Sequence, residues 1–178
     1  DGGLGDLVKQ SLAYRLARPV VVDLTDESMN GGVLIDALNL GADVVTANKG
    51  PLADCAETFE ALMGGNDADR LTRGEATVGA GLPIMDTVEM LVASGDVLTE
   101  VEGCLSGTLG FISDMLGQGV ALSKAVQDAQ ALGYTEPDPA VDLSGLDVAR
   151  KAKIIARMSG WKVPDDAVRV DGLVPPDW

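Results

Sequence analysis

The residues best suited to chemistry on a small charged substrate gather in one stretch of the sequence, residues 133–151. Their types are carboxylates and one amine, at Glu136, Asp142, Asp147 and Lys151. On a helix, residues four apart such as Asp147 and Lys151 share one face, with Cβ atoms about 5–6 Å apart. Carboxylates can hold a substrate ammonium, and a lysine among them can exchange a proton with a hydroxyl or carbonyl oxygen. The alternative is an ordinary surface ion pair behind a rigid Pro-Asp-Pro turn.

The backbone of this stretch follows from its prolines and its apolar spacing. A proline fixes its own φ and disfavours helical backbone in the residue before it, so we expect extended backbone at Glu136 and Asp138. From about Leu146, apolar residues recur at helical spacing, which predicts a helix that ends near residue 159. The expected result is a loop and a first helical turn that aim several carboxylates and one ammonium at a common volume.

The composition limits the partners and the chemistry. The 178 residues carry a net charge of −15 and include no histidine. Such a surface is a poor partner for nucleic acid or an anionic membrane, and proton transfer falls to lysine, carboxylates or tyrosine. Cys55 and Cys104 lie in apolar contexts, which predicts buried thiols rather than a disulfide or a metal site. With no membrane-spanning apolar run and no signal-peptide pattern, we expect a soluble, cytoplasmic chain.

The first part of the chain alternates between strand and helix patterns. Apolar, β-branched runs predict buried parallel strands at residues 19–25 and 43–49, with a helix between them. This is a βαβ unit with a right-handed crossover, and ligands of such sheets bind beyond the carboxyl ends of the strands. Thr25 and the turn with Asn48 and Lys49 occupy those ends. A purely structural interpretation, with Asn48 as a turn former and Lys49 solvated, is equally open.

A glycine-rich segment at residues 79–81 does not fit a dinucleotide-binding loop. Pro83 follows closely, the third glycine is missing, and no full βαβ unit surrounds the segment. We expect a sharp turn that presents backbone carbonyls and then starts a helix, with Pro83 near its first position. Glu75 and these carbonyls could form an oxygen cage for a hard cation. The plain alternative is a close-packed turn without an ion.

The second part of the chain mixes strands with helices. Strands are predicted at residues 97–106 and 167–170, and helices at residues 107–116 and 124–132. Ser123 is a candidate cap for the second of these helices, and Gly133 for its end. We place the domain change near residue 83.

Six motifs in order give the chain a resemblance to homoserine dehydrogenase. They are VDLT at 22–25, VVTANKGPLA at 44–53, EATVGAGLPI at 75–84, LSGTLGFI at 105–112, GYTEPDP at 133–139 and DLSGLDVARK at 142–151. Each motif alone is weak, but six in the family's order are specific. The resemblance implies an α/β fold in which residues 1–83 are the C-terminal part of a Rossmann-like nucleotide-binding domain. Residues 84–178 would be a mixed α+β domain for substrate binding and dimerisation.

The resemblance also implies an activity and a set of site residues. The family is an NAD(P)-dependent oxidoreductase of threonine and methionine biosynthesis that interconverts L-aspartate 4-semialdehyde and L-homoserine. Lys151 would be the proton donor, with Lys49 close to the nicotinamide and the substrate. The substrate would be bound by Glu136, Asp142, Asp147 and Thr108, and NAD or NADP by Thr25, Ala47, Lys49 and Gly133. Sodium or potassium would be bound by Glu75 and the carbonyls of Val78, Ala80 and Leu82.

Some features depart from the family pattern and leave alternatives open. The family often has Asn at the position of Ser106, and it begins with a Gly-rich pyrophosphate loop that does not precede Asp1. We therefore expect an internal portion of the enzyme. The portion could belong to a working homoserine dehydrogenase, to a non-catalytic binding or dimerisation module, or to a related amino-acid dehydrogenase. The resemblance further suggests a homodimer, while the choice between NAD and NADP stays open.

Overall fold

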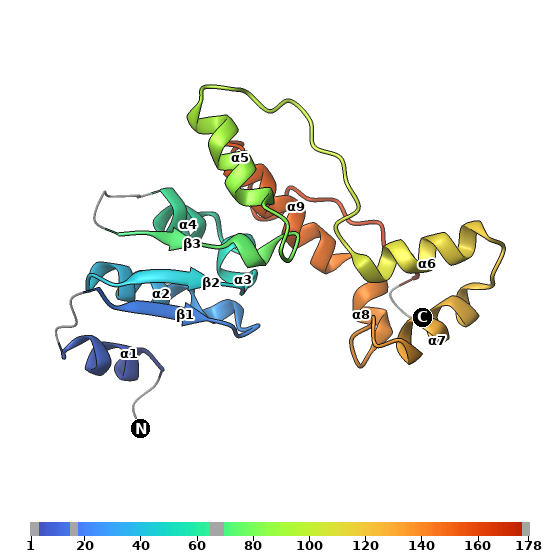
Figure 1. Ribbon diagram of the computed structural model, residues 1–178, viewed down its shortest axis with the longest axis horizontal. Helices are drawn as coiled ribbons and strands as arrows, with labels where there is room; N and C mark the ends of the chain where they lie inside the picture. The colour runs from blue at the N-terminus through green and yellow to red at the C-terminus, as the bar shows by residue number, and fades with distance from the viewer. Residues whose placement is uncertain (1–3, 15–17, 65–69, 176–178) are drawn as a thin grey trace. The chain divides into compact units, whose positions relative to one another are not determined.

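The computed structural model describes residues 4–14, 18–64 and 70–175 of the chain (Figure 1). The chain forms two compact units. Unit 1 contains Asp1–Leu98 and Lys153–Ala167, and unit 2 contains Thr99–Ala152 and Val168–Trp178. The prediction of a domain change near residue 83 stays a prediction, although residues 84–98 belong to the same compact unit as the segments before them.

Unit 1 is built around a parallel sheet. Its strands are β1 (Val20–Asp23), β2 (Asp43–Thr46) and β3 (Thr72–Arg73), in the order β1-β2-β3 (Figure 1). Val20 pairs with Asp43 and Val44 pairs with Thr72, so β2 is central and Val44 is fully buried. Between β1 and β2 lie η1 (Ser28–Asn30) and α2 (Gly31–Asn39), which confirms the predicted βαβ unit. Gly41, at φ +90°, ends the connection as a left-handed residue.

Helices surround this sheet within unit 1. They are α1 (Leu4–Leu12), α3 (Gly50–Ala53), α4 (Ala56–Phe59), the π-helical η2 (Glu60–Gly64), η3 (Glu75–Thr77) and α5 (Ile84–Ala93). The buried guanidinium of Arg157 donates to the carbonyl oxygens of Leu52, at 2.9 Å, and Ala53, at 3.0 Å. It also pairs with Asp165 at 2.7 Å. These bonds fix the last turn of α9 (Leu146–Met158) to α3 and to the segment with Asp165.

Unit 2 is helical in the residues that the structure describes. It contains α6 (Gly107–Gly117), α7 (Leu122–Ala131), α8 (Pro139–Leu143) and the first half of α9. Helices α6 and α7 pack side by side (Figure 1), and their apolar faces form a small core. The buried members of that core are Ile112, Ala125, Val126, Ala129 and Leu143. Gly133, at φ +73°, ends α7 as predicted.

The structure corrects several predictions about local structure. The strands predicted at residues 97–106 and 167–170 are wrong, because both segments lack ladder pairing. An alternating pattern forms a strand only where a neighbouring strand offers hydrogen bonds. Ser123 does not cap α7, because the N-cap is Ala121. Cys104 is exposed and Cys55 only partly buried, although both thiols are free as expected.

The helices are short compared with the thickness of a bilayer. Among those in the described part of the chain, none combines the length with the hydrophobicity needed to span a membrane.

Candidate active site

Lys151, in the first half of α9, is held between two oxygen acceptors. Its Nζ lies 2.7 Å from Oδ2 of Asp147, one turn earlier on the helix, so the predicted i,i+4 pair is formed. The same Nζ donates to the carbonyl oxygen of Leu105 at 2.8 Å. The Lys151 side chain is 19% exposed and that of Asp147 is 43% exposed. An ordinary surface pair leaves the lysine in solvent, whereas this amine is partly buried and fixed in direction by two bonds.

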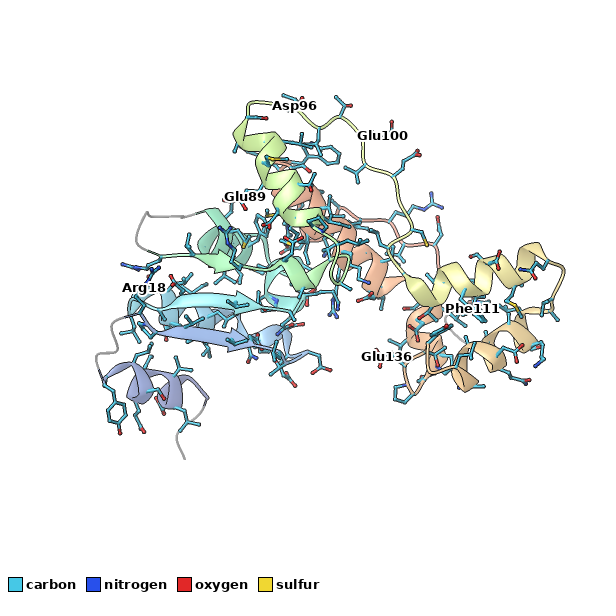
Figure 2. The ribbon with its side chains drawn as sticks, in the orientation of Figure 1. Arg18, Glu89, Asp96, Glu100, Phe111 and Glu136 are labelled. Atoms are coloured by element: carbon cyan, nitrogen blue, oxygen red, sulfur yellow. The ribbon has the colours of Figure 1, made fainter. Side chains whose placement is uncertain are left out.

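The segment before α8 folds around Asp142. One carboxylate oxygen of Asp142 accepts the backbone N–H of Glu136 at 2.8 Å. Asp138 has extended backbone, as predicted, and caps α8 by accepting the N–H of Ala140 at 3.0 Å, with Pro139 at the first helical position. Asp142 therefore fixes the loop that presents the exposed Glu136 side chain (Figure 2). The helix α8 was missed, since its five residues are too few for a periodic signal.

Thr108 and Gly133, predicted to contact different ligands, lie in one pocket. The pocket has a volume of about 560 Å³ and is lined by Gly107, Thr108, Phe111, Gly133 and Tyr134. The Thr108 hydroxyl donates to the backbone carbonyl of Tyr134. The rings of Phe111 (Figure 2) and Tyr134 meet edge to face, with centroids 5.2 Å apart. Sequence reasoning missed both aromatic residues, because nothing in their spacing marks them as neighbours.

The pocket and the charged residues are tied together within unit 2. Leu105, the acceptor of Lys151, lies three residues before Thr108 on the chain segment that enters α6. Tyr134, the partner of Thr108, lies two residues before Glu136. Short connections therefore join the pocket to Lys151 on one side and to Glu136 on the other. Unit 2 thus holds Lys151, several carboxylates and a partly apolar pocket in one compact unit.

In unit 1, Thr25, Ala47 and Lys49 follow the carboxyl ends of adjacent parallel strands, as predicted. The backbone N–H of Ala47 donates to the Asp23 carbonyl at 2.9 Å, so the two strand ends are joined. The Asp23 carboxylate accepts the Thr25 hydroxyl at 2.7 Å and the Thr25 N–H at 3.0 Å. Lys49 is the N-cap residue of α3. These are the positions at which α/β sheets bind ligands.

Asn48 and Asp23 form the centre of this strand-end arrangement. Asn48 Nδ2 donates to Asp23 Oδ2 at 3.0 Å and to the Glu27 carbonyl at 2.9 Å, while its Oδ1 accepts the Gly50 N–H at 3.0 Å. Burial raises the pKa of Asp23, but hydrogen bonds from Thr25 and Asn48 outweigh burial and leave that pKa below its ordinary value. The sequence marked Asn48 only as a turn former and gave no sign of Asp23's role.

The segment predicted to bind a cation is a tight turn that leads into α5. The two carboxylate oxygens of Glu75 accept the N–H groups of Met85, at 3.2 Å, and Asp86, at 3.0 Å. Glu75 therefore interacts with the N-terminal end of α5, where the helix dipole favours an anion. Ala80 has the left-handed φ of 53°, as the expected sharp turn requires. The Leu82 carbonyl accepts the Ile84 N–H at 2.8 Å.

A second group of possible metal ligands lies in unit 1. One ligand atom each from Cys55, Glu57 and Asp165 lies within 4.8 Å of the others. Asp165 is already bonded to Arg157, and the Cys55 thiol donates to Glu57 at 3.2 Å, which lowers the pKa of Glu57. The group is satisfied by its own hydrogen bonds, and we assign it no ligand.

The comparisons with known proteins identify the fold class and the family of the chain. The parallel sheet with its crossover places unit 1 in the Rossmann-like α/β class. The model of the homoserine dehydrogenase family matches residues 83–175. A homoserine dehydrogenase of Emericella nidulans is 38% identical over 177 residues, which cover 96% of this chain and 48% of that protein. The chain belongs to the homoserine dehydrogenase family.

Solved structures show the same similarity. A putative homoserine dehydrogenase from Archaeoglobus fulgidus superposes with a TM-score of 0.76 at 31% identity, over 97% of this chain and 52% of that one. A hyperthermophilic archaeal homoserine dehydrogenase in complex with NADPH superposes with a TM-score of 0.65 at 28% identity, over 84% of this chain and 46% of that one. The chain spans about half the length of these proteins, and about a fifth of a bifunctional aspartokinase/homoserine dehydrogenase of Haemophilus influenzae.

Proposed function

We propose that this chain is part of an NAD(P)-dependent homoserine dehydrogenase that interconverts L-aspartate 4-semialdehyde and L-homoserine. The observation that carries the proposal is the position of Lys151, a partly buried amine bonded to Asp147 and to the Leu105 carbonyl. Its neighbours in unit 2 are carboxylates and a pocket of about 560 Å³. Family membership supports the reaction type, and the geometry around Lys151 supports this amine as the proton donor of that reaction.

Lys151 acts as the proton donor in the reductive direction. Bound NAD(P)H supplies the hydride, which goes to the aldehyde carbon. The electron pair of the C=O π bond moves to oxygen, and Lys151 transfers a proton to that oxygen to form the hydroxyl group of homoserine. A positioned acid of this kind contributes about 10²–10⁴-fold in rate. Asp147 and Leu105 keep the amine pointing in one direction before the substrate arrives.

The amino-acid end of the substrate is held by carboxylates. Glu136 and Asp147 bind the substrate ammonium, and Asp142 assists by fixing the backbone of Glu136. Thr108 contributes a contact from the pocket wall, where its hydroxyl is already oriented by Tyr134. Such a set selects a short amino-acid aldehyde, because the carboxylates must bind the substrate ammonium at a fixed distance from the reacting carbon.

Thr25, Ala47, Lys49 and Gly133 contribute to the nucleotide site. The strand ends of β1 and β2 suit a nicotinamide nucleotide, because parallel α/β sheets bind ligands beyond the carboxyl ends of their strands. The archaeal relative in complex with NADPH supports NADP, and NAD stays an equal proposal. Lys49 adds positive charge near the nicotinamide.

Three further parts of the proposal concern surroundings and assembly. Sodium or potassium binds at Glu75 with the carbonyls of Val78, Ala80 and Leu82, if Glu75 gives up its amide contacts in α5. The protein works in the cytoplasm as a homodimer whose contacts come from the predicted substrate domain, residues 84–178. Its reaction belongs to threonine and methionine biosynthesis.

The direct test is oxidation of L-homoserine by the full-length protein. NAD⁺ and NADP⁺ are compared as oxidants through the absorbance of the reduced nucleotide, with L-serine and L-threonine as matched hydroxy amino acids. We expect turnover with L-homoserine at least about a hundredfold above both controls. Binding of a nicotinamide nucleotide without any turnover would instead favour the non-catalytic module.

A further inference from the structure

The backbone that presents Thr25 and Lys49 is held by side chains that contact no ligand in the proposed function. Thr25 is fixed through the carboxylate of Asp23, which accepts both its N–H and its hydroxyl. Lys49 lies between Asn48, which is only 3% exposed, and Gly50, whose N–H donates to Asn48 Oδ1. The Asn48 side chain joins these two arrangements, because its Nδ2 donates to Asp23 Oδ2 at 3.0 Å and lies 3.4 Å from the Thr25 hydroxyl oxygen.

We infer that Asp23 and Asn48 are positioning residues that hold Thr25 and Lys49 at the spacing needed for the nicotinamide nucleotide. This inference rests on the proposed function for its ligand. It goes further because neither residue touches the nucleotide: both act through the neighbours that they fix. Asp23 ends β1, and Asn48 lies two residues beyond the end of β2, so their bond extends the backbone contact between Ala47 and Asp23 into the turn that carries Lys49.

The chemistry of the pair requires an amide at residue 48. The Asn48 side chain donates to Asp23 and to the Glu27 carbonyl, and it accepts from Gly50. A carboxylate there would accept from Gly50 but would face both the Asp23 carboxylate and the Glu27 carbonyl with like charge. A side chain without an amide would leave the buried Asp23 oxygen without this donor, and burial makes such a loss costly.

The turn around Lys49 has little room to adjust. A Cβ atom on Gly50 would lie 2.5 Å from the Cα of Ser28, so the turn after β2 packs directly against η1. The Thr25 hydroxyl is held from the η1 side as well, because Asn30 Nδ2 donates to it at 2.8 Å. Because both sides pack against η1, we expect the carboxylate repulsion that Asn48→Asp introduces to shift Lys49 relative to Thr25 rather than to be relieved within the turn.

The test compares variants of the full-length protein in NADPH binding and in steady-state kinetics. We expect Asn48→Asp to raise the Kd of NADPH and its KM about tenfold, with the KM of L-homoserine nearly unchanged. Asn48→Ser keeps a short acceptor for Gly50 but no donor that reaches Asp23. This variant should give the same shift, and it replaces Asn48→Asp in the test if Asn48→Asp fails to fold. The exchange Asp23→Asn with Asn48→Asp restores the bond between residues 23 and 48 but not the donor to the Glu27 carbonyl, so its Kd should lie between those of Asn48→Asp and the wild type.

A matched control distinguishes positioning from general destabilisation. Asp43 caps the opposite end of the sheet, where its carboxylate accepts the N–H of Leu71 at 3.0 Å. Asp43→Ala should lower the melting temperature while the Kd of NADPH stays within about twofold. The inference is overturned if Asn48→Asp and Asn48→Ser keep the wild-type Kd of NADPH. It is also overturned if the exchange binds NADPH no more tightly than Asn48→Asp, or if Asp43→Ala weakens NADPH binding as much as Asn48→Asp does. A wild type that binds neither NADPH nor NADH overturns the proposed function and this inference together, whereas an active wild type with unaffected variants overturns this inference alone.

Discussion

Lys151 and Asp147 show how single side chains define a reacting position. The aspartate carboxylate and the Leu105 carbonyl occupy two of the three donor directions of the ammonium group, at 2.7 Å and 2.8 Å. We propose that the third donor meets a substrate oxygen. Asp147 is more exposed than the lysine, and we propose that it binds the substrate ammonium.

Replacement of Asp147 by Asn tests this division of roles. The amide keeps the shape of the side chain but removes the charge that attracts the substrate ammonium. We expect the KM of L-homoserine to rise about tenfold, with a smaller fall in kcat. Asp128→Asn on α7 is the matched control, because Asp128 pairs with Lys124 at the same i,i+4 spacing. A fall in kcat alone, with KM unchanged, would move substrate binding away from Asp147.

The lowered pKa of Asp23 predicts how stability depends on pH. A carboxyl group whose folded-state pKa is below its ordinary value stabilises the fold above about pH 4 and loses this contribution as the pH falls through the folded-state pKa. The difference in unfolding free energy between the wild type and Asp23→Asn should therefore be constant from about pH 7 to 5 and shrink below about pH 4. Urea titrations at several pH values measure it. A difference that grows in acid contradicts the hydrogen-bond account.

At the scale of elements, the start of α6 shows what keeps the pocket wall in place. Ser106 is the N-cap of α6, and its side chain accepts the N–H of Leu109 at 3.1 Å. The first turn of this helix carries Thr108, and the residue before the cap is Leu105, the acceptor of Lys151. The cap thus holds both the pocket and the lysine's partner.

Loss of this cap should have a measurable cost. We expect Ser106→Ala to lower the unfolding free energy by about 1 kcal/mol, whereas Ser106→Asn, which can still accept the N–H, changes it by only a few tenths. Ser123→Ala is the control, because α7 has Ala121 and not Ser123 as its N-cap. Chemical denaturation of the three variants makes the comparison. Equal losses for Ser106→Ala and Ser123→Ala would contradict the assignment of the cap.

The sequence predicted the elements whose signals are local and missed those that depend on partners. The βαβ unit, α6 and α9 were predicted, because each has a long apolar pattern or a glycine at its end. The two-residue strand β3 is too short to carry a pattern and forms only through its pairing with β2. The expected strand at residues 97–106 had the alternation but has no ladder in the described structure.

Prediction of the site followed the same division. Motif order placed Lys151, Asp147, Asp142 and Glu136 in one site. The structure pairs Lys151 with Asp147 and the Glu136 backbone with Asp142, and their roles in substrate binding stay a prediction. The roles of Asp23 and Asn48 could not be predicted, because their bond joins residues 25 positions apart. No local spacing rule connects such a pair.

At the scale of the whole chain, a net charge of −15 sets the response to salt. Like charges repel in the compact state, and salt screens them over a Debye length that falls from about 30 Å at 0.01 M to about 3 Å at 1 M. We expect the melting temperature of this chain to rise steeply with sodium chloride. The same titration near pH 4.1, the isoelectric point, is the control and should be almost flat. A flat response at neutral pH would contradict repulsion as the cause.

The most direct test of the account as a whole is the turnover of a full-length Lys151→Ala variant. Because proton donation to the new alkoxide falls to this amine, kcat should drop by at least about two orders of magnitude, while the Kd of NADPH barely changes. Lys124→Ala, which removes a lysine from the i,i+4 pair on α7, is the control and should turn over at the wild-type rate. Near-normal turnover of Lys151→Ala, or complete loss of turnover in Lys49→Ala with normal NADPH binding, would contradict Lys151 as the proton donor.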